Sequence, residues 1–252
     1  RSPPECHPNT RTTIRNEIAW WLDESVSKKS PLLWLNGPAA VGKSVIAKTV
    51  SGFHGQIIAA FFFSTSSDKT AATLFPTLAW QLARRIPDTR KHIITSLKSS
   101  DSLQTSQIEE QFDLLIIQPL KSTTTLKCRP VMVIDGVDEC TDERMLGRLL
   151  RVLIQAGEGG DMPVRFVICS RPEPRIHAIL LGGDRDVIST IRIGFSQDCK
   201  DDMTRYLTDK FNAIRQPRDG PSPWFQPSDI SDLVEASSGQ FLYVSTIVRL
   251  LD

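Results

Sequence analysis

The sequence lacks a strong charge of either sign. Across its 252 residues, 30 lysines and arginines nearly balance 29 aspartates and glutamates, which leaves a formal net charge of +1. We therefore expect no nucleic-acid partner, because nucleic acids bind to basic protein surfaces. Hydrophobic residues make up 40% of the chain and charged residues 23%, a balance that excludes disordered and collagen-like chains.

Paired cysteines and long apolar runs are also missing. The five cysteines are widely spaced and form no Cys-x-x-Cys pair, so we expect reduced thiols in a cytoplasmic protein rather than a disulfide framework. The longest apolar run, Ile57–Phe63, has seven residues, which suits a buried strand and is too short to cross a bilayer. The chain begins without a signal-type segment and ends inside an apolar pattern. We expect a fragment of a longer intracellular protein.

Short apolar runs alternate with segments of helical periodicity along most of the chain. Strands are expected over about 32–35, 57–63, 131–134, 164–169 and 187–193. Helices are expected over about 12–28, 43–51, 74–86, 108–116 and 145–152. This alternation predicts a parallel sheet with right-handed crossover helices.

The strand patterns stop after about residue 195. The remaining segment shows helical periodicity near 203–211, 230–236 and 241–251, with a loop rich in proline and glycine at 216–223. The sequence therefore predicts two parts. These are an α/β nucleotide-binding domain over residues 1–195 and a helical lid subdomain over 196–252, truncated at its C-terminal end.

One segment matches the phosphate-binding pattern G-x-x-x-x-G-K-[ST] between a predicted strand and a predicted helix. It comprises Gly37, Pro38, Ala39, Ala40, Val41, Gly42, Lys43 and Ser44, with Val45 next in the helix. The two glycines allow successive backbone N–H groups to turn inward as an anion nest at the helix N-terminus. The Lys43 ammonium would reach the β- and γ-phosphates, and the Ser44 hydroxyl would bind Mg²⁺. The alternative, a glycine-rich turn that binds nothing, requires a chance match of the whole pattern.

An acidic group outside the phosphate loop is also needed, because the loop alone leaves the metal short of ligands. Four apolar residues, 131–134, lead to Asp135 at the end of the third predicted strand, where ligands of parallel sheets bind. Asp135 would orient the Mg²⁺ together with Ser44. Asp138 and Glu139 follow one turn later, where a carboxylate could align the attacking water. Alternatively, these two residues only precede the next helix.

Arg171 follows the fourth predicted strand. Its guanidinium could sense or neutralise the γ-phosphate; alternatively, it is a surface arginine before a helix that begins at a proline. Gly37–Ser44, Asp135 and Arg171 each lie where a strand meets its following loop. The sequence therefore predicts a P-loop NTPase, an α/β fold whose mainly parallel five-stranded sheet is flanked by helices. Its proposed catalytic residues are Lys43, Asp135, Asp138, Glu139 and Arg171.

These residues resemble the NACHT group of STAND-class signal-transduction NTPases. Asp135–Glu139, with a small residue after the metal carboxylate and an acidic pair beyond it, is similar to that group, and Ser170–Pro172 is similar to its sensor segment. Further stretches resemble the fungal branch, typified by heterokaryon-incompatibility and nephrocystin-like proteins. They are Cys6–Arg11, Trp34–Gly37, Phe61–Ser64, Thr77–Leu82, Gln118–Leu120 and Gly239–Tyr243. The resemblance covers nearly the whole chain.

The resemblance implies a regulatory switch that is closed with ADP at rest and self-associates with ATP when triggered. It also implies an effector domain and a sensor domain outside this segment. Thr10 and Arg11 match the family segment beside the adenine, so a base or ribose contact is expected there; alternatively, they only begin the first helix. Ala40 and Cys169 depart from the family, which often has glycine and threonine at these positions.

We therefore expect Mg²⁺-dependent binding and slow hydrolysis of ATP, with GTP the less favoured nucleotide. The resemblance places this activity in a fungal protein of innate immunity or incompatibility. Two alternatives remain open. A nucleotide-stabilised interaction scaffold would bind without turnover, and a small-molecule phosphotransferase would need an acceptor pocket, for which the sequence shows no motif.

Overall fold

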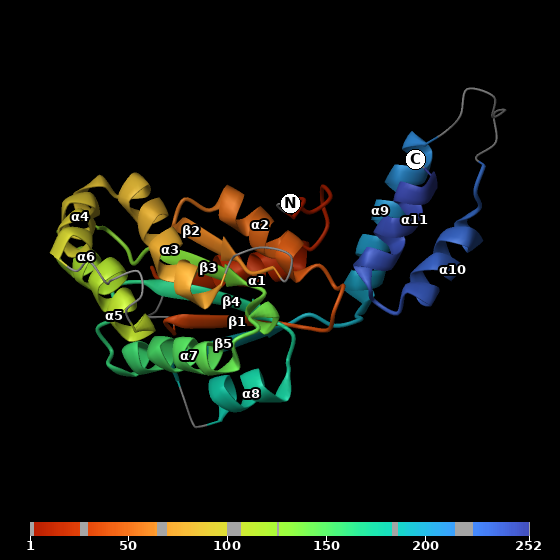
Figure 1. Cartoon of the computed structure of the whole chain (residues 1–252). Helices are drawn as coiled ribbons and strands as arrows, with labels where there is room; N and C mark the ends of the chain where they lie inside the picture. Colours follow the sequence, from red (N-terminus) through yellow and green to blue (C-terminus); the bar gives the residue numbers. More distant parts are fainter. Residues whose placement is uncertain are drawn as a thin grey trace.

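A five-stranded sheet forms the centre of the molecule in its computed structural model (Figure 1). The structure describes residues 3–25, 30–64, 70–99, 107–124, 126–182, 186–214 and 224–251. The strands are β1 (Leu32–Asn36), β2 (Ile57–Phe62), β3 (Val131–Asp135), β4 (Arg165–Ser170) and β5 (Ile188–Arg192). Their order across the sheet is β2-β3-β4-β1-β5, and every neighbouring pair is parallel. The predicted α/β fold with a parallel five-stranded sheet is therefore confirmed.

The burial of each strand follows from its place in the sheet. The central strands β1, β3 and β4 are buried along their whole length, because helices cover a parallel sheet on both faces. The edge strand β2 alternates between buried and half-buried residues. At the other edge, β5 buries only Ile191 among its residues. Continuous burial thus marks the central strands, whereas the longest apolar run of the sequence, expected to be a buried strand, forms the half-buried edge strand β2.

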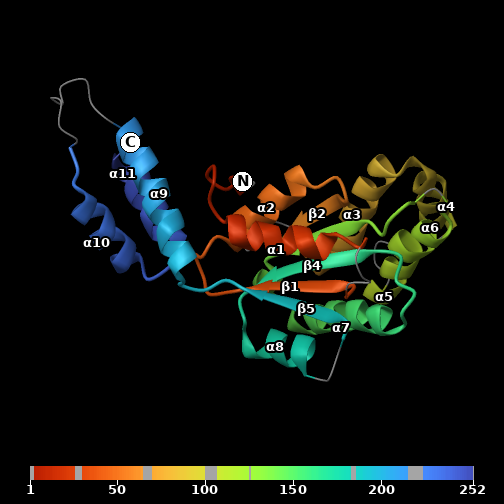
Figure 2. The same ribbon diagram turned by 180° about the vertical axis from the view of Figure 1, so that it is seen from behind.

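Helices cover both faces of the sheet, as the two views show (Figures 1 and 2). On one face, a core joins the sheet to α1 (Thr12–Leu22) and α2 (Lys43–Phe53). On the other face, a second core joins it to α3 (Ala71–Arg85), α4 (Arg90–Ser99), α5 (Ile108–Phe112), α6 (Gln118–Lys121), α7 (Glu143–Glu158) and α8 (Pro174–Leu181). Successive residues of each central strand alternate between these two cores.

The last helices form a bundle with a core of its own. They are α9 (Gln197–Ala213), α10 (Pro227–Ser237) and α11 (Phe241–Leu251). β5 leads directly into α9, so the bundle stands at the end of the molecule toward which β5 runs (Figure 1). We call it the lid bundle. A domain boundary at residue 195 remains a prediction.

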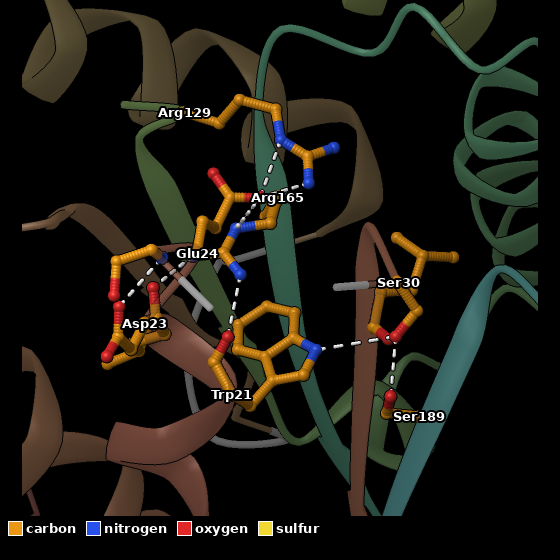
Figure 3. Close-up of polar contacts among 10 residues, drawn as sticks. Trp21, Asp23, Glu24, Ser30, Arg129, Arg165 and Ser189 are labelled. Carbon is orange, nitrogen blue, oxygen red and sulfur yellow. Dashed lines mark hydrogen bonds and ion pairs between the residues drawn. The ribbon is translucent and has the colours of Figure 1, made fainter. Parts of the chain in front are cut away.

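Helix α1 ends at Leu22, earlier than the predicted end near residue 28. Asp23 is already extended, with φ −76° and ψ 106°. The guanidinium of Arg165, fully buried at the start of β4, donates hydrogen bonds to the carbonyls of Trp21 and Leu22 at 2.8 and 2.7 Å (Figure 3). These are carbonyls that a further helical turn would use. A distant side chain therefore ends the helix, and no local pattern predicts it.

Two further elements differ from the sequence-based expectation. Helix α4 was not predicted, because it carries only three apolar residues, of which only Ile93 is buried. The helix predicted near 108–116 contains a π-helical turn over Asp113–Ile117, whose hydrogen bonding no simple periodicity indicates. The predicted loop at 216–223 lies outside the described residues.

Two expectations from composition also concern the whole fold. No helix in the described parts of the chain is long and apolar enough to span a membrane. All five cysteines are free thiols in the structure, as their spacing predicts.

Candidate functional site

The phosphate-binding loop runs from the end of β1 to the start of α2. At Gly37, an added Cβ would lie 2.6 Å from the carbonyl oxygen of Ile193, so only glycine fits there. Gly42 has φ +94° directly before α2, and Ala40 is also left-handed, with φ +65°. Pro38 and Ala39 in the loop are exposed, and Ser44 and Val45 in the first turn of α2 are half-buried. The backbone therefore makes the sharp turn that a phosphate nest requires.

Lys43 is the first residue of α2, and its ammonium folds over the loop. It donates hydrogen bonds to the carbonyls of Gly37 and Pro38 at 2.8 and 2.7 Å. Burial lowers the pKa of Lys43, and the negative charges of Asp138 and Asp135 offset part of this effect. The ammonium thus lies in the field of two carboxylates at the phosphate loop, the place where a phosphate-binding lysine is needed.

Asp135 ends β3 with its side chain inside the protein. It is 3% exposed, and burial raises its pKa to about 6, although a hydrogen bond with Ser44 and the charge of Lys43 lower it. Its Oδ1 has no hydrogen-bond partner among the described residues. A buried oxygen of this kind is costly unless a ligand uses it. Ser44 and Asp135 therefore fit a hard cation such as Mg²⁺, which prefers oxygen ligands.

Protein ligands alone do not complete such a site. Within the described ranges, no group of three or more His, Cys, Asp or Glu side chains could hold a metal ion. Mg²⁺ in phosphate sites is commonly held by one or two side chains together with water and the phosphates. Ser44 and Asp135 therefore match a site in which Mg²⁺ is held partly by water and phosphates, rather than one in which protein side chains supply all of the ligands.

Asp138 and Arg171 face each other at the same edge. Gly136 has φ +73° and turns the chain after β3 into a 3₁₀ turn, Val137–Glu139. Asp138 Oδ1 accepts a hydrogen bond from the backbone N–H of Arg171 at 3.2 Å, and its Oδ2 lies 3.1 Å from Arg171 Nε. The Asp138 side chain is 6% exposed and that of Arg171 51%. The arginine therefore reaches from the surface to a buried carboxylate.

Arg175 belongs to this edge, and sequence reasoning missed it. From the start of α8, its Nη2 donates to the backbone carbonyl of Asp138 at 3.1 Å. It also pairs with Glu143 and Glu173, at 3.0 and 2.8 Å. Arg175 thereby fixes the turn that carries Asp138 and the half-buried Glu139. An arginine in the first turn of a helix gives no sequence signal of this role.

Thr10 and Arg11 are both buried, and Arg11 lies against the phosphate loop. The Thr10 hydroxyl donates to the carbonyl of His7 at 2.7 Å, and Arg11 Nη2 donates to the carbonyl of Val41 at 2.8 Å. The backbone N–H of Arg11 donates to Asp202 of α9 at 2.9 Å. Arg11 therefore joins the loop to the lid bundle. A contact of Thr10 or Arg11 with the nucleotide remains a prediction.

Solved structures share this fold. The chain is similar to the Walker-type ATPase PABY2304 of Pyrococcus abyssi, with 14% identity and a TM-score of 0.60 over 97% of this chain and 69% of that one. It is also similar to PCH-2 of C. elegans, with 14% identity and a TM-score of 0.47 over 96% of this chain and 63% of that one. No curated protein matches the chain. The likeness to the Walker-type ATPase confirms the P-loop NTPase fold.

The family comparison covers the same part of the chain as the site. Residues 10–171 match the family described as Nephrocystin 3, N-terminal. The matched segment contains the phosphate loop and Asp135, and it ends at Arg171. It makes up more than half of the 252 residues. The chain therefore belongs to the Nephrocystin 3, N-terminal family.

Proposed function

We propose that the protein binds ATP with Mg²⁺ and hydrolyses it slowly as a conformational switch. The observation that carries the proposal is the convergence of five side chains at the carboxyl edge of one parallel sheet. They are Lys43, Ser44, Asp135, Asp138 and Arg171. Ligands of parallel α/β sheets bind at this edge, and the P-loop NTPase fold provides the frame.

Each side chain has a role that its position supports. Lys43 would leave the loop carbonyls and bind the β- and γ-phosphates. Ser44 and Asp135 would hold Mg²⁺, which, when bound, neutralises charge on the phosphates. Arg171 would bind the γ-phosphate, and Asp138, released from its ion pair, would orient the attacking water. Because Arg171 must leave Asp138 to reach the γ-phosphate, we expect slow hydrolysis.

The resemblance of the site residues to NACHT proteins supports a signalling role. The backbone N–H of Leu242, in α11, donates to the carbonyl of Ala40 in the phosphate loop at 3.1 Å. A change in the loop therefore reaches the lid bundle directly. We infer a closed ADP state and an ATP state that self-associates. Effector and sensor domains outside this segment would read the difference, in a cytoplasmic signalling protein of the fungal incompatibility type.

A melting series tests nucleotide binding. A ligand at one hundred times its dissociation constant adds about 2.7 kcal/mol, which raises the Tm by about 5–10 °C for a chain of this size. We expect this shift with Mg·ADP and Mg·ATP, a smaller one with Mg·GTP, and none in Lys43→Ala. Lys48→Ala, about one and a half turns along α2 and outside the site, is the matched control. No shift in the wild type would contradict the proposal.

A nucleotide-stabilised scaffold without turnover is the second candidate. One observation favours it: both oxygens of Asp138 are engaged by Arg171, which leaves Glu139 as the other carboxylate that could orient water. Phosphate release separates the two functions. Slow release that Arg171→Gln alters supports the switch, whereas stabilisation with no release supports the scaffold. Rapid transfer to a small-molecule acceptor would instead indicate a phosphotransferase.

A further inference from the structure

Two carbonyl groups of the phosphate loop are held by residues outside the loop. The carbonyl of Ala40 accepts a hydrogen bond from the backbone N–H of Leu242 at 3.1 Å. The carbonyl of Val41 accepts one from Arg11 Nη2 at 2.8 Å. In a trans peptide unit the N–H points away from the C=O. The first contact therefore sets the direction of the Val41 N–H, and the second sets that of the Gly42 N–H.

Arg11 connects these contacts to the lid bundle. Its side chain is buried, and its guanidinium carbon lies 5.0 Å from the ring centroid of Phe241, at the start of α11. Its backbone N–H donates to Asp202 of α9 at 2.9 Å. A guanidinium in this position combines a hydrogen bond to the loop with a cation–π contact to the lid. The lid bundle cannot move away from the loop without changing a contact of Arg11.

Ala40 makes the loop depend on these external contacts. Its φ of +65° lies in the left-handed region, which a residue with a Cβ atom enters at a cost and glycine enters freely. The neighbouring Gly42 has φ +94° without such a penalty. At Ala40, therefore, the surrounding structure must hold the backbone in place.

We propose that Arg11 is a positioning residue for the phosphate loop. Together with Leu242, it aims the Val41 and Gly42 N–H groups, so phosphate binding depends on the docking of the lid bundle. Ala40 strengthens this dependence, because its left-handed backbone relaxes when the contacts are lost. The inference rests on nucleotide binding at the loop, as proposed above, and adds the coupling between lid and loop.

A double-mutant cycle tests the coupling, with the dissociation constant of Mg·ADP measured by calorimetry. We expect Arg11→Met to weaken binding about tenfold in the wild-type background. In the Ala40→Gly background, the same substitution should weaken binding less than about threefold, because glycine enters the left-handed conformation without a steric cost. Arg15→Met is the matched control, since Arg15 stacks on Phe53 at the far end of α2 and should leave the affinity unchanged.

An equal loss in both backgrounds would overturn the proposal, because Arg11 would then act independently of the loop. A second readout needs no nucleotide: the NMR order parameters of the Val41 and Gly42 amides. Arg11→Met should lower them from about 0.85 to below about 0.6, and Arg15→Met should not. If the wild type binds no Mg·ADP, the proposed function has failed. The order parameters of the Val41 and Gly42 amides then test the positioning role of Arg11 by themselves. Unchanged values in Arg11→Met would then refute it.

Discussion

Asp135 is a buried carboxylate with one oxygen that no described residue binds. Without a cation, this charge destabilises the fold. We predict that Asp135→Asn raises the free energy of unfolding by about 1–3 kcal/mol at pH 7.5 in EDTA, while the variant loses stabilisation by Mg·ATP. Urea denaturation of both proteins measures the effect. A variant less stable than the wild type would show that Asp135 has a structural role instead.

The pH dependence of this difference has a definite sign. The pKa of Asp135 is raised from its ordinary value of 3.8 to about 6. A group whose pKa is raised in the folded state makes its full contribution to stability below its pKa in the unfolded state. That contribution is lost as the pH rises through its pKa in the folded state. The advantage of Asp135→Asn should therefore shrink below about pH 6 and vanish near pH 4. A constant difference across this range would contradict the account.

Arg171 distinguishes ATP from ADP if it binds the γ-phosphate. We predict that Arg171→Gln weakens the binding of a non-hydrolysable Mg·ATP analogue about tenfold and leaves Mg·ADP within about twofold, since an arginine–phosphate contact is a charge-assisted hydrogen bond. Calorimetric titration with both ligands measures this. Arg144→Gln, an exposed arginine of α7, is the control. Equal losses for the two nucleotides would remove the γ-phosphate role.

Among the elements, the end of α1 is attached to the sheet by an ion cluster around the buried Arg165, whose acidic and basic neighbours are half-buried (Figure 3). Glu24 pairs with Arg129 and lies 3.6 Å from Arg165 Nε. Because Glu24→Gln would leave the fully buried Arg165 without its counter-charge, we predict a loss of about 3 kcal/mol in the free energy of unfolding. Urea denaturation at neutral pH checks it. A loss below about 0.5 kcal/mol would mean that the cluster behaves like a surface pair.

The same cluster contributes to acid sensitivity. Burial alone would raise the pKa of Glu24, but its hydrogen bond with Arg129 and the charge of Arg165 lower it below 4.5. A lowered pKa gives stability that is present above the unfolded value and lost as the pH falls through the folded one. The wild type should therefore lose stability below about pH 4.5 more steeply than Glu24→Gln.

The edge strand β2 is closed by one side chain of α3. Gln81 accepts from the backbone N–H of Ala60 at 3.0 Å and donates to its carbonyl at 2.9 Å. These are the bonds that an added strand would make. We predict that Gln81→Leu promotes concentration-dependent self-association, detected by sedimentation velocity. Arg85→Leu adds the same apolar side chain one turn further along α3 and should sediment like the wild type; association of both variants would point to surface apolarity instead.

For strands, helices and the phosphate loop, the sequence predicts the features that short local patterns determine. The central strands follow from their continuous apolar runs, and the phosphate loop from glycines at Gly37 and Gly42, where the backbone requires them. Contacts between distant segments are not encoded in this way. The end of α1 depends on Arg165, and the acidic turn depends on Arg175. Neither arginine differs in its local sequence from a surface residue.

At the scale of the whole molecule, the chain has two cores on the faces of the sheet and a third inside the lid bundle. The candidate site lies where the carboxyl ends of β1, β3 and β4 meet, and the lid bundle touches it at Ala40. The sequence indicates the site residues by their place after strands. It gives no indication that the lid bundle holds the phosphate loop, because that contact is made through the backbone N–H of Leu242.

The most direct test of nucleotide binding is a calorimetric titration of the wild type, Lys43→Ala and Lys48→Ala with Mg·ADP and a non-hydrolysable Mg·ATP analogue. We predict one site per chain in the wild type and in Lys48→Ala, and no measurable heat of binding in Lys43→Ala. Binding that survives Lys43→Ala, or its absence from the wild type, would contradict the assignment of this loop as the nucleotide site.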